Sequence, residues 1–238
     1  MKRFAVEEEV FQRLPGYCLG VVAARGLDNT RERGAIARML EDNAVNFAEC
    51  FREASVRDIP FVAAYREAFT KLGMNPNKFP CSIEALMKRV QKNGRLPHIN
   101  PIVDLGNAFS LQYQLPMGAH DIDKLHAAGM EIRFSTVQDH FLGMGEEQAE
   151  NMPAGELVYV SGNTVKTRRW IWRQSEDGRI TEATGHVLFP IDGFEGVNQE
   201  EVAAARDALA EFLRREFSCE VWTGYINRRN PGFDFSWT

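Results

Sequence analysis

Hydrophobic and polar positions recur with different periods along the chain, and the first third has the period of helices. Residues 15–25, PGYCLGVVAAR, form a nearly unbroken apolar run, which is typical of a buried strand. Three segments with apolar residues at helical spacing follow: one running to about Ala54 with Asp28, Asn29 or Thr30 as its cap, one from Pro60 to Gly73, and one from a Ser82 cap to Asn93-Gly94. The sequence therefore predicts a mainly helical first third after one early strand.

The second half has the shorter period of β-structure. Short apolar segments separated by glycine-rich or acidic turns predict strands at 131–134, 156–160, 168–172 and 186–190. Asp177-Gly178 indicates a tight hairpin turn within 175–180. Asn198 is expected to cap a further helix, 219–226 to form a last strand, and the tail NRRNPGFDFSWT to be irregular. Helices packed on a mixed sheet, in a single domain of residues 1–238, make this an α+β fold.

Residues 95–125, RLPHINPIVDLGNAFSLQYQLPMGAHDIDKL, fit neither period. Short polar side chains alternate with apolar ones between fixed prolines, a pattern that suits the wall of a pocket. The alternative is a set of capping side chains around tight turns. For the cluster as a whole we expect a pocket, and we take as candidate catalytic residues Asn100, Asp104, Asn107, Ser110, His120 and Asp121. All of these except Ser110 are expected to converge on one concavity, with Arg169 or Arg173 at its edge.

The segment TRRWIWRQ, residues 167–174, is a second candidate cluster. In a strand, Trp170 and Trp172 would share one face, and Trp170 is expected to belong to the core. Arg169 and Arg173 would share the other face, where a guanidinium group can bind a carboxylate or phosphate, or stack on a base. Asp104 or Asp121 could equally be their structural partners, and the sequence favours neither alternative.

Charge and composition narrow the class of protein. The 238 residues carry a net charge of −5, which argues against nonspecific coating of nucleic acid. A local basic group, Lys88, Arg89, Lys92 and Arg95, could contact RNA or could simply favour the C-terminus of a helix. No apolar run is long enough for a membrane helix, and the four separate cysteines are expected to be free thiols in a reducing cytoplasm.

Established catalytic motifs are absent from the sequence. His120, Asp121, Asp123 and His126 lack the spacing of a zinc site, so we expect no metal and no cofactor. Cys81 follows Pro80 at a predicted helix start, where a thiolate could be stabilised, and it is the one nucleophile worth excluding.

Three motifs, in this order, resemble a known family. IN-x-x-VD-x-x-N at 99–107 and PM-x-x-x-D-x-DK-L at 116–125 resemble the B3/B4 editing module of the phenylalanyl-tRNA synthetase β subunit. Residues 65–97 and 155–174 resemble freestanding proteins that contain this module alone. The resemblance covers about 61–193 and implies a layered β-β-α sandwich.

The resemblance implies an editing site, because the synthetase module hydrolyses tyrosine wrongly esterified to the phenylalanine tRNA. By position, the residues that carry over are Asn100, Asp104, Asn107, Pro116, Met117, Asp121 and Asp123. The synthetase motif reads P-M-H-A-F-D, so its histidine aligns with Gly118 and its phenylalanine with His120. TRRWIWRQ replaces the synthetase's glycine-rich pocket loop, so we expect a different pocket shape.

Two functions remain open from the sequence. The first is a tRNA-associated editing-like protein that hydrolyses mischarged aminoacyl-tRNA, with Arg169, Arg173, Trp172 and the basic group at Lys88 to Arg95 as substrate or RNA contacts. The second is a binding module for tRNA, RNA or a small molecule such as an amino acid or nucleotide, and Gly118 favours it. A metabolic enzyme that uses the pocket for another small molecule is a weaker third alternative. Nothing resembles the aminoacylation site of a synthetase.

Overall fold

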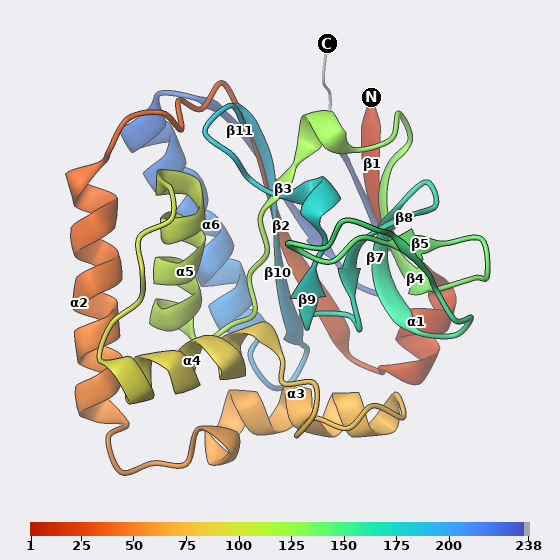
Figure 1. Ribbon diagram of the computed structural model, residues 1–238, viewed down its shortest axis with the longest axis horizontal. Coiled ribbons are helices and arrows are strands. Elements are labelled where there is room, and N and C mark those ends of the chain that lie inside the picture. Colours follow the sequence, from red (N-terminus) through yellow and green to blue (C-terminus); the bar gives the residue numbers. More distant parts are fainter. Residues whose placement is uncertain (236–238) are drawn as a thin grey trace.

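Three layers make up the molecule (Figure 1). Helices α2 (Gly34–Cys50), α5 (Pro101–Tyr113) and α6 (Gln199–Phe217) cover one face of a four-stranded sheet, and a larger sheet lies on its other face. The computed structural model describes residues 1–235. The remaining helices flank the layers: α1 (Glu8–Arg13), α3 (Pro60–Lys71), α4 (Ser82–Asn93) and the short 3-10 helices η1 (Val56–Asp58), η2 (Ile122–Lys124) and η3 (Glu176–Gly178).

The smaller sheet is antiparallel and lies in the middle layer. Its order is β11 (Glu220–Ile226), β2 (Tyr17–Arg25), β10 (His186–Phe194), β3 (His120–Asp121). Almost every residue of β2 and β10 is buried, because helices cover one face and the larger sheet covers the other. Gly193 lets α6 approach closely, since a Cβ there would lie 2.4 Å from Val202 Cγ2.

The larger sheet is mixed. Its order is β12 (Gly232–Phe235), β1 (Lys2–Val6), β4 (Gly129–Phe134), β7 (Leu157–Ser161), β8 (Thr164–Arg168), β5 (His140–Phe141), β6 (Glu150–Asn151), and β9 (Arg173–Gln174) pairs with β8. The pairs β1–β4 and β5–β8 are parallel and the others antiparallel. Pairing of β1 with β12 brings Lys2 opposite Phe235, so both ends of the described chain share one edge of the sheet.

The α+β class and the β-β-α layering expected from the sequence are confirmed. The early strand and the strands expected at 131–134, 156–160, 186–190 and 219–226 correspond to β2, β4, β7, β10 and β11. Within residues 1–235, no helix combines the length and the hydropathy needed to cross a membrane.

Helix α5 is the largest correction, because the polar segment 95–125 was expected to lack a regular helix. Pro101 occupies the first helical turn, and the Asn100 side chain accepts a hydrogen bond from Val103 N (3.0 Å). Asn29 Oδ1 accepts a second one from Ile102 N (3.0 Å). The helix is buried on most of its surface, so no single apolar stripe marks it in the sequence.

The segment 168–172 was wrongly predicted as a strand. Strand β8 ends at Arg168, and Arg169 and Trp170 take left-handed conformations with φ of 49° and 59°. The two tryptophans therefore do not share a strand face. Trp170 is nevertheless fully buried, as expected of a core residue. The turn 169–172 joins β8 to β9, so the hairpin lies earlier than the predicted one at 175–180, where η3 forms instead.

Several expected caps and ends also differ. Helix α2 begins at Gly34 and ends at Cys50, not at a cap in 28–30 and at Ala54. Cys81, not Ser82, occupies the cap position of α4, and its side chain forms no cap hydrogen bond. Asn198 lies at the cap position of α6, but its Oδ1 accepts from Phe194 N. The tail is not wholly irregular, because β12 forms within it; its last residues, 236–238, lie outside the described chain.

Candidate functional site

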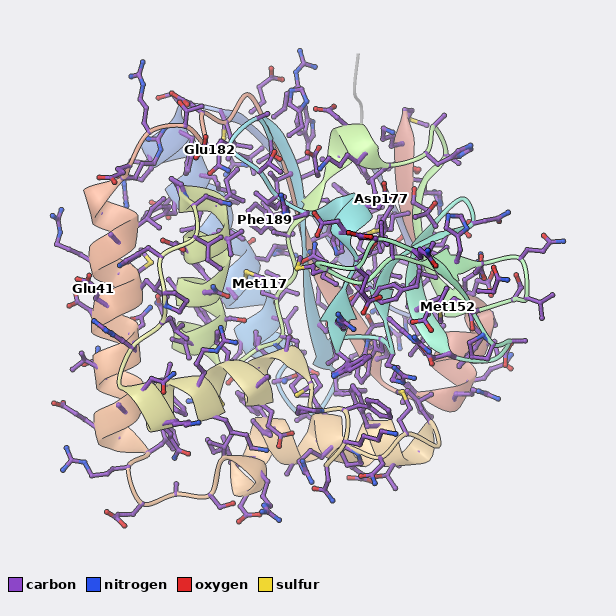
Figure 2. All side chains as sticks on the ribbon, viewed as in Figure 1. Glu41, Met117, Met152, Asp177, Glu182 and Phe189 are labelled. Atoms are coloured by element: carbon purple, nitrogen blue, oxygen red, sulfur yellow. The ribbon has the colours of Figure 1, made fainter. Side chains whose placement is uncertain are left out.

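An open cleft of about 630 Å³ lies beside the N-terminal half of α5. Asn100, Val103 and Asn107 form its α5 wall, and the segment 117–119 and the loop 179–183 form the others. Met117 and Glu182 of these walls are labelled in Figure 2. The lining combines apolar side chains with amide, hydroxyl and charged groups, a composition typical of small-molecule sites. We call this space the outer cleft.

A smaller cavity of about 220 Å³ adjoins the outer cleft, and we call it the inner cavity. Four residues line both spaces and form the junction between them: Asn107, Met117, Gly118 and Gln174. Deeper in, the inner cavity is lined by His120, Tyr159, Thr167, Trp172, Ser82 and Asp192, among others. The side chains of Asn107, Ser82 and Thr167 form no hydrogen bond within residues 1–235, so their polar atoms are available to a ligand.

His120 is buried at the base of the junction, and only 1% of its surface is exposed. Its Nδ1 is buried and has no hydrogen-bond partner within the described residues. The imidazole stacks on Tyr159, with ring centroids 5.9 Å apart. Burial lowers its pKa to about 3, with a smaller contribution from nearby Lys166, so the ring is neutral at physiological pH. A buried polar group without a partner is uncommon and calls for a functional explanation.

Gly118 and His120 share one small volume. A Cβ on Gly118 would lie 3.2 Å from His120 Nε2 and 3.2 Å from Pro190 Cγ. A side chain at position 118 would therefore crowd the imidazole of His120. The absence of a side chain at Gly118 leaves the histidine in place at the junction.

Asp192 is the buried acid of the inner cavity. Its Oδ1 accepts hydrogen bonds from Tyr17 Oη (2.6 Å), Tyr159 Oη (2.6 Å) and Trp170 Nε1 (2.9 Å). Its Oδ2 accepts only from Tyr159 Oη (2.7 Å). Burial raises the pKa of Asp192 to about 6, although the hydrogen bonds from the three donors oppose the shift. No cation pairs with this carboxylate within residues 1–235.

The structure brings some of the expected polar residues to the two spaces and leaves others outside them. Asn100 and Asn107 line the outer cleft, and His120 lines the inner cavity. Asp104 lies outside both spaces: its carboxylate accepts from Ile99 N (2.9 Å) and pairs with His98 Nδ1 (2.8 Å). Capping and turn bonds account for Asp121, which accepts from Asp123 N and Thr184 Oγ1, and for Ser110, which donates to Leu115 O.

The two arginines of 167–174 pair with residues other than those the sequence suggested. Arg169 pairs with Glu156 (3.4 Å) and stacks on Phe79 and Trp172, with its guanidinium carbon 4.0 Å and 4.7 Å from their ring centres. Arg173 pairs with Glu146 (3.0 Å) and is partly exposed. Neither contacts Asp104 or Asp121. Arg169 therefore supports the Trp172 wall of the inner cavity from outside it.

The four basic residues Lys88, Arg89, Lys92 and Arg95 are exposed along the end of α4 and the segment after it. Lys88 pairs with the buried Glu84, which also binds Arg66 (2.8 Å). Arg89, Lys92 and Arg95 form no ion pair within the described chain. Lys88 therefore has a structural partner, and the other three are available to an external anion.

Cys81 is fully buried, and burial raises the pKa of its thiol to about 12. It therefore remains protonated at physiological pH, contrary to the stabilised thiolate that its position suggested. Among residues 1–235, no three His, Cys, Asp or Glu side chains are grouped so as to hold a metal ion.

Sequence patterns missed several residues of the two spaces. Gln174 closes the junction, with its Nε2 bound to Ala119 O (2.6 Å), and it was noted only as part of the 167–174 segment. Asp192 could have been noticed, because an acid inside the apolar strand sequence VLFPIDGF needs a reason. The sequence of the loop 179–183 has no motif that indicates a site, and the loop lines the outer cleft because the fold places it there.

Comparison with known proteins places this architecture in a family. The sequence profile of the B3/4 domain matches residues 64–217. The chain belongs to the B3/4 domain family. The match extends past the expected limit near Gly193 and takes in α6, and it confirms the resemblance carried by residues 99–107 and 116–125. A search of curated proteins gave no match.

A solved structure has the same fold as this B3/4 protein. It is the crystal structure of an N-terminal fragment of the phenylalanyl-tRNA synthetase β-subunit from Pyrococcus horikoshii, with a TM-score of 0.50 and 10% sequence identity. The similarity covers 94% of this chain and 54% of that fragment, so the B3/4 protein spans about half of its structural relative. At this identity the likeness establishes the fold alone.

Proposed function

We propose that this B3/4 protein binds the aminoacylated 3′ end of a tRNA in the outer cleft and inner cavity, and hydrolyses the ester of a mischarged amino acid. Family membership and the fold of a synthetase fragment support a tRNA-related role. The finer assignment to editing rests on the sequence resemblance and on the chemistry of the cleft. The protein is proposed to act in the cytoplasm and without a cofactor.

The sizes of the two spaces suit the two parts of such a substrate. The outer cleft, of about 630 Å³, would hold the terminal nucleoside, and the inner cavity, of about 220 Å³, would hold part of the amino acid. The ester would then lie at the junction formed by Asn107, Met117, Gly118 and Gln174. Asn107 has a free amide there that could donate to the developing oxyanion.

The observation that carries the proposal is the neutral imidazole of His120, whose Nε2 faces Gly118 at this junction. The family motif has its histidine at the position of Gly118, and here an imidazole two residues later borders the same space. The apparent loss of the motif histidine therefore need not remove an imidazole from the site. Because its pKa is about 3, His120 is neutral and would accept a hydrogen bond from water or donate one to it.

The chemistry asked of these residues is modest, because an aminoacyl ester is already activated. A water held by His120 Nε2, which faces Gly118, and by Gln174 Oε1, which forms no hydrogen bond within residues 1–235, would attack the ester carbon. Asn107 would stabilise the oxyanion. As the bond from the carbonyl carbon to the ribose oxygen breaks, the proton lost by the attacking water would pass to that oxygen, which leaves a free amino acid and a tRNA hydroxyl. No covalent acyl-enzyme is required, and the protonated, buried Cys81 could not supply one.

RNA contact would come from the exposed residues Arg89, Lys92 and Arg95, which have no ion-pair partner in the described chain. Trp172 and Arg169 add a stacked aromatic and guanidinium surface close to the inner cavity. Arg173 is partly exposed and is held by Glu146, so its contribution to substrate binding would be smaller.

The second candidate is a binding module that holds the same ligand without hydrolysing it. The depressed pKa of His120 favours this alternative, because an efficient general base has a pKa near the working pH. Incubating the purified protein with a panel of mischarged tRNAs separates the two. Release of an amino acid from at least one of them supports hydrolysis. Saturable binding of aminoacyl-tRNA with no release supports the binding module. If the protein shows no release and no saturable binding, both functions are rejected.

A further inference from the structure

The inner cavity contains a buried negative charge that nothing in the described chain balances. Asp192 is 2% exposed, and its three side-chain partners, Tyr17, Tyr159 and Trp170, are neutral hydrogen-bond donors. Buried carboxylates are usually paired with a cation, because burying an isolated charge is costly. Two cations close to the cavity have other partners: Lys166 is bound to Asp177 and to Lys124 O (3.0 Å), and Arg169, which stacks on Trp172, pairs with Glu156 (3.4 Å).

The hydrogen bonds on Asp192 are distributed unequally between its two oxygens. Oδ1 accepts from all three donors, whereas Oδ2 accepts only from Tyr159 Oη, which it shares with Oδ1. A carboxylate has about four acceptor positions. Since Asp192 lines the inner cavity, Oδ2 is the oxygen with acceptor capacity left for a ligand.

The rest of the cavity suits a positive group. Tyr159 contributes an aromatic ring, which attracts cations, whereas the ring of Trp172 already carries the Arg169 guanidinium. Neutral His120 and the hydroxyls of Ser82 and Thr167 add possible acceptors. Among the described residues that line the cavity, Asp192 is the only one of formal charge, and no lysine or arginine is present to repel a cation.

We infer that the inner cavity binds a primary ammonium group of the ligand, with Asp192 Oδ2 as its charged acceptor. In an aminoacyl ester this group is either the α-ammonium or the side-chain ammonium of a basic amino acid. The inference deepens the proposed function and rests on it only for the identity of the ester. An ammonium group would supply the positive charge that Asp192 lacks, which a neutral hydroxyl would not.

Calorimetric titration at pH 7 with two matched probes tests the chemistry. 2-Phenylethylamine and 2-phenylethanol share a carbon skeleton and differ in the terminal group. The amine is expected to bind roughly tenfold to hundredfold tighter to the wild-type protein, as for a charge-assisted hydrogen bond. Equal affinities would overturn the inference. Phenylalaninol and Nα-acetyl-lysine methylamide then distinguish the two sources, because the first carries an α-ammonium and the second only a side-chain ammonium.

Two variants locate the acceptor. Asp192→Asn is expected to abolish the preference for the amine, and Tyr17→Phe, which removes one neutral donor but keeps the carboxylate, is expected to retain it. A preference that survives Asp192→Asn in a protein of unchanged circular dichroism would contradict the assignment. If Asp192→Asn does not fold, the wild-type pH series decides: the preference should fall below about pH 6, where Asp192 takes up a proton, and a constant preference would contradict it.

The titratable groups packed around Asp192 do not change charge near pH 6, so the pH series reports on Asp192 itself. Tyr17 and Cys18 of β2, Tyr65 of α3 and Tyr159 of β7 all have pKa values raised by burial, so they stay neutral below pH 7. His120 of β3 has its pKa lowered to about 3 and also keeps its charge state near pH 6. Amine preference without turnover of any mischarged tRNA would keep the inference and reject hydrolysis; turnover without the preference would do the reverse.

Discussion

His120 and Asp192 are buried titratable residues that line one cavity, and burial shifts their pKa values in opposite directions. His120 has a folded pKa of about 3, below its unfolded value of ~6.5, so its stabilisation is present above about pH 6.5 and lost as pH falls. Asp192 has a folded pKa of about 6, above its unfolded value of ~3.9, so its contribution is present below about pH 4 and lost as pH rises through 6. Between about pH 4 and 6 the two effects oppose each other.

Single substitutions should separate these effects. In His120→Gln only the contribution of Asp192 to the pH dependence remains, and it lowers the unfolding free energy as pH rises. The unfolding free energy of this variant should therefore fall more steeply with rising pH than that of the wild type, by up to about 1.4 kcal/mol per pH unit. Asp192→Asn should change the slope by a similar amount in the other direction. Urea unfolding at several pH values between 4 and 6 measures both slopes. Parallel pH profiles for the wild type and both variants would show that neither residue titrates as described.

Cys81 and Cys50 provide a comparison of thiol accessibility. Cys81 is buried with a pKa of about 12, and Cys50 is exposed at the end of α2. Iodoacetamide should alkylate Cys50 in the native protein and leave Cys81 unmodified, as peptide mass spectrometry would record. Cys81→Ala should keep most of any hydrolytic activity. A trapped thioester on Cys81, or loss of activity in Cys81→Ala with the fold intact, would replace the positioned-water mechanism by a covalent one.

At the scale of elements, α5 depends on two asparagines from different parts of the chain. Asn100 accepts from Val103 N, and Asn29 accepts from Ile102 N while its Nδ2 donates to Thr181 O (2.8 Å) of the cleft loop. Asn100→Ala and Asn29→Ala should each lower the unfolding free energy by about 1 kcal/mol. Thr30→Ala, an exposed neighbour, should change it by less than about 0.5 kcal/mol. Thermal unfolding measures all three, and equal shifts would assign no capping role to the asparagines.

The same helix shows where sequence patterns lose their predictive value. Apolar periodicity located the strands β4, β7 and β10, because each is a short segment between clear turns. Periodicity failed for α5, since burial on nearly all sides leaves no polar face. The Asn100 cap and Pro101 in the first turn were present in the sequence but were interpreted as parts of a pocket wall. Asn29 was expected only as a possible cap of the helix that follows it; its bond to α5 could not be predicted, because the partner Ile102 lies 73 residues away.

The turn 169–172 failed for a different reason. Its composition is aromatic and β-branched, which favours a strand, but Arg169 and Trp170 are left-handed. Tertiary contacts hold this conformation: Trp170 donates to Asp192 (2.9 Å), and Arg169 stacks on Phe79 and Trp172. The pocket wall at Trp172 therefore depends on contacts that local propensity does not encode. Of the candidate site, the sequence predicted Asn100, Asn107 and His120 at the cleft and missed Gln174 and Asp192.

On the scale of the whole molecule, tRNA binding should depend on a local basic surface because the net charge is −5. Replacing Arg89, Lys92 and Arg95 together by Glu should weaken tRNA binding and reduce its salt dependence. Lys88 is left unchanged, because its pairing with buried Glu84 is structural. Arg38→Glu with Arg215→Glu and Arg229→Glu changes the net charge by the same amount, at exposed positions of α2, at the end of α6 and between β11 and β12, and is the matched control. Filter binding at several salt concentrations measures the effect, and equal losses in both variants would indicate net charge alone.

We propose that the junction of the outer cleft and the inner cavity hydrolyses an aminoacyl ester. Single-turnover release of the amino acid from mischarged tRNA, measured for wild type, Asn107→Ala and Cys81→Ala, tests it most directly. Wild type and Cys81→Ala are expected to release the amino acid, and Asn107→Ala is expected to release it at least tenfold more slowly, because Asn107 would donate to the oxyanion. Full activity in folded Asn107→Ala, or no release by wild type from any mischarged tRNA, would contradict it.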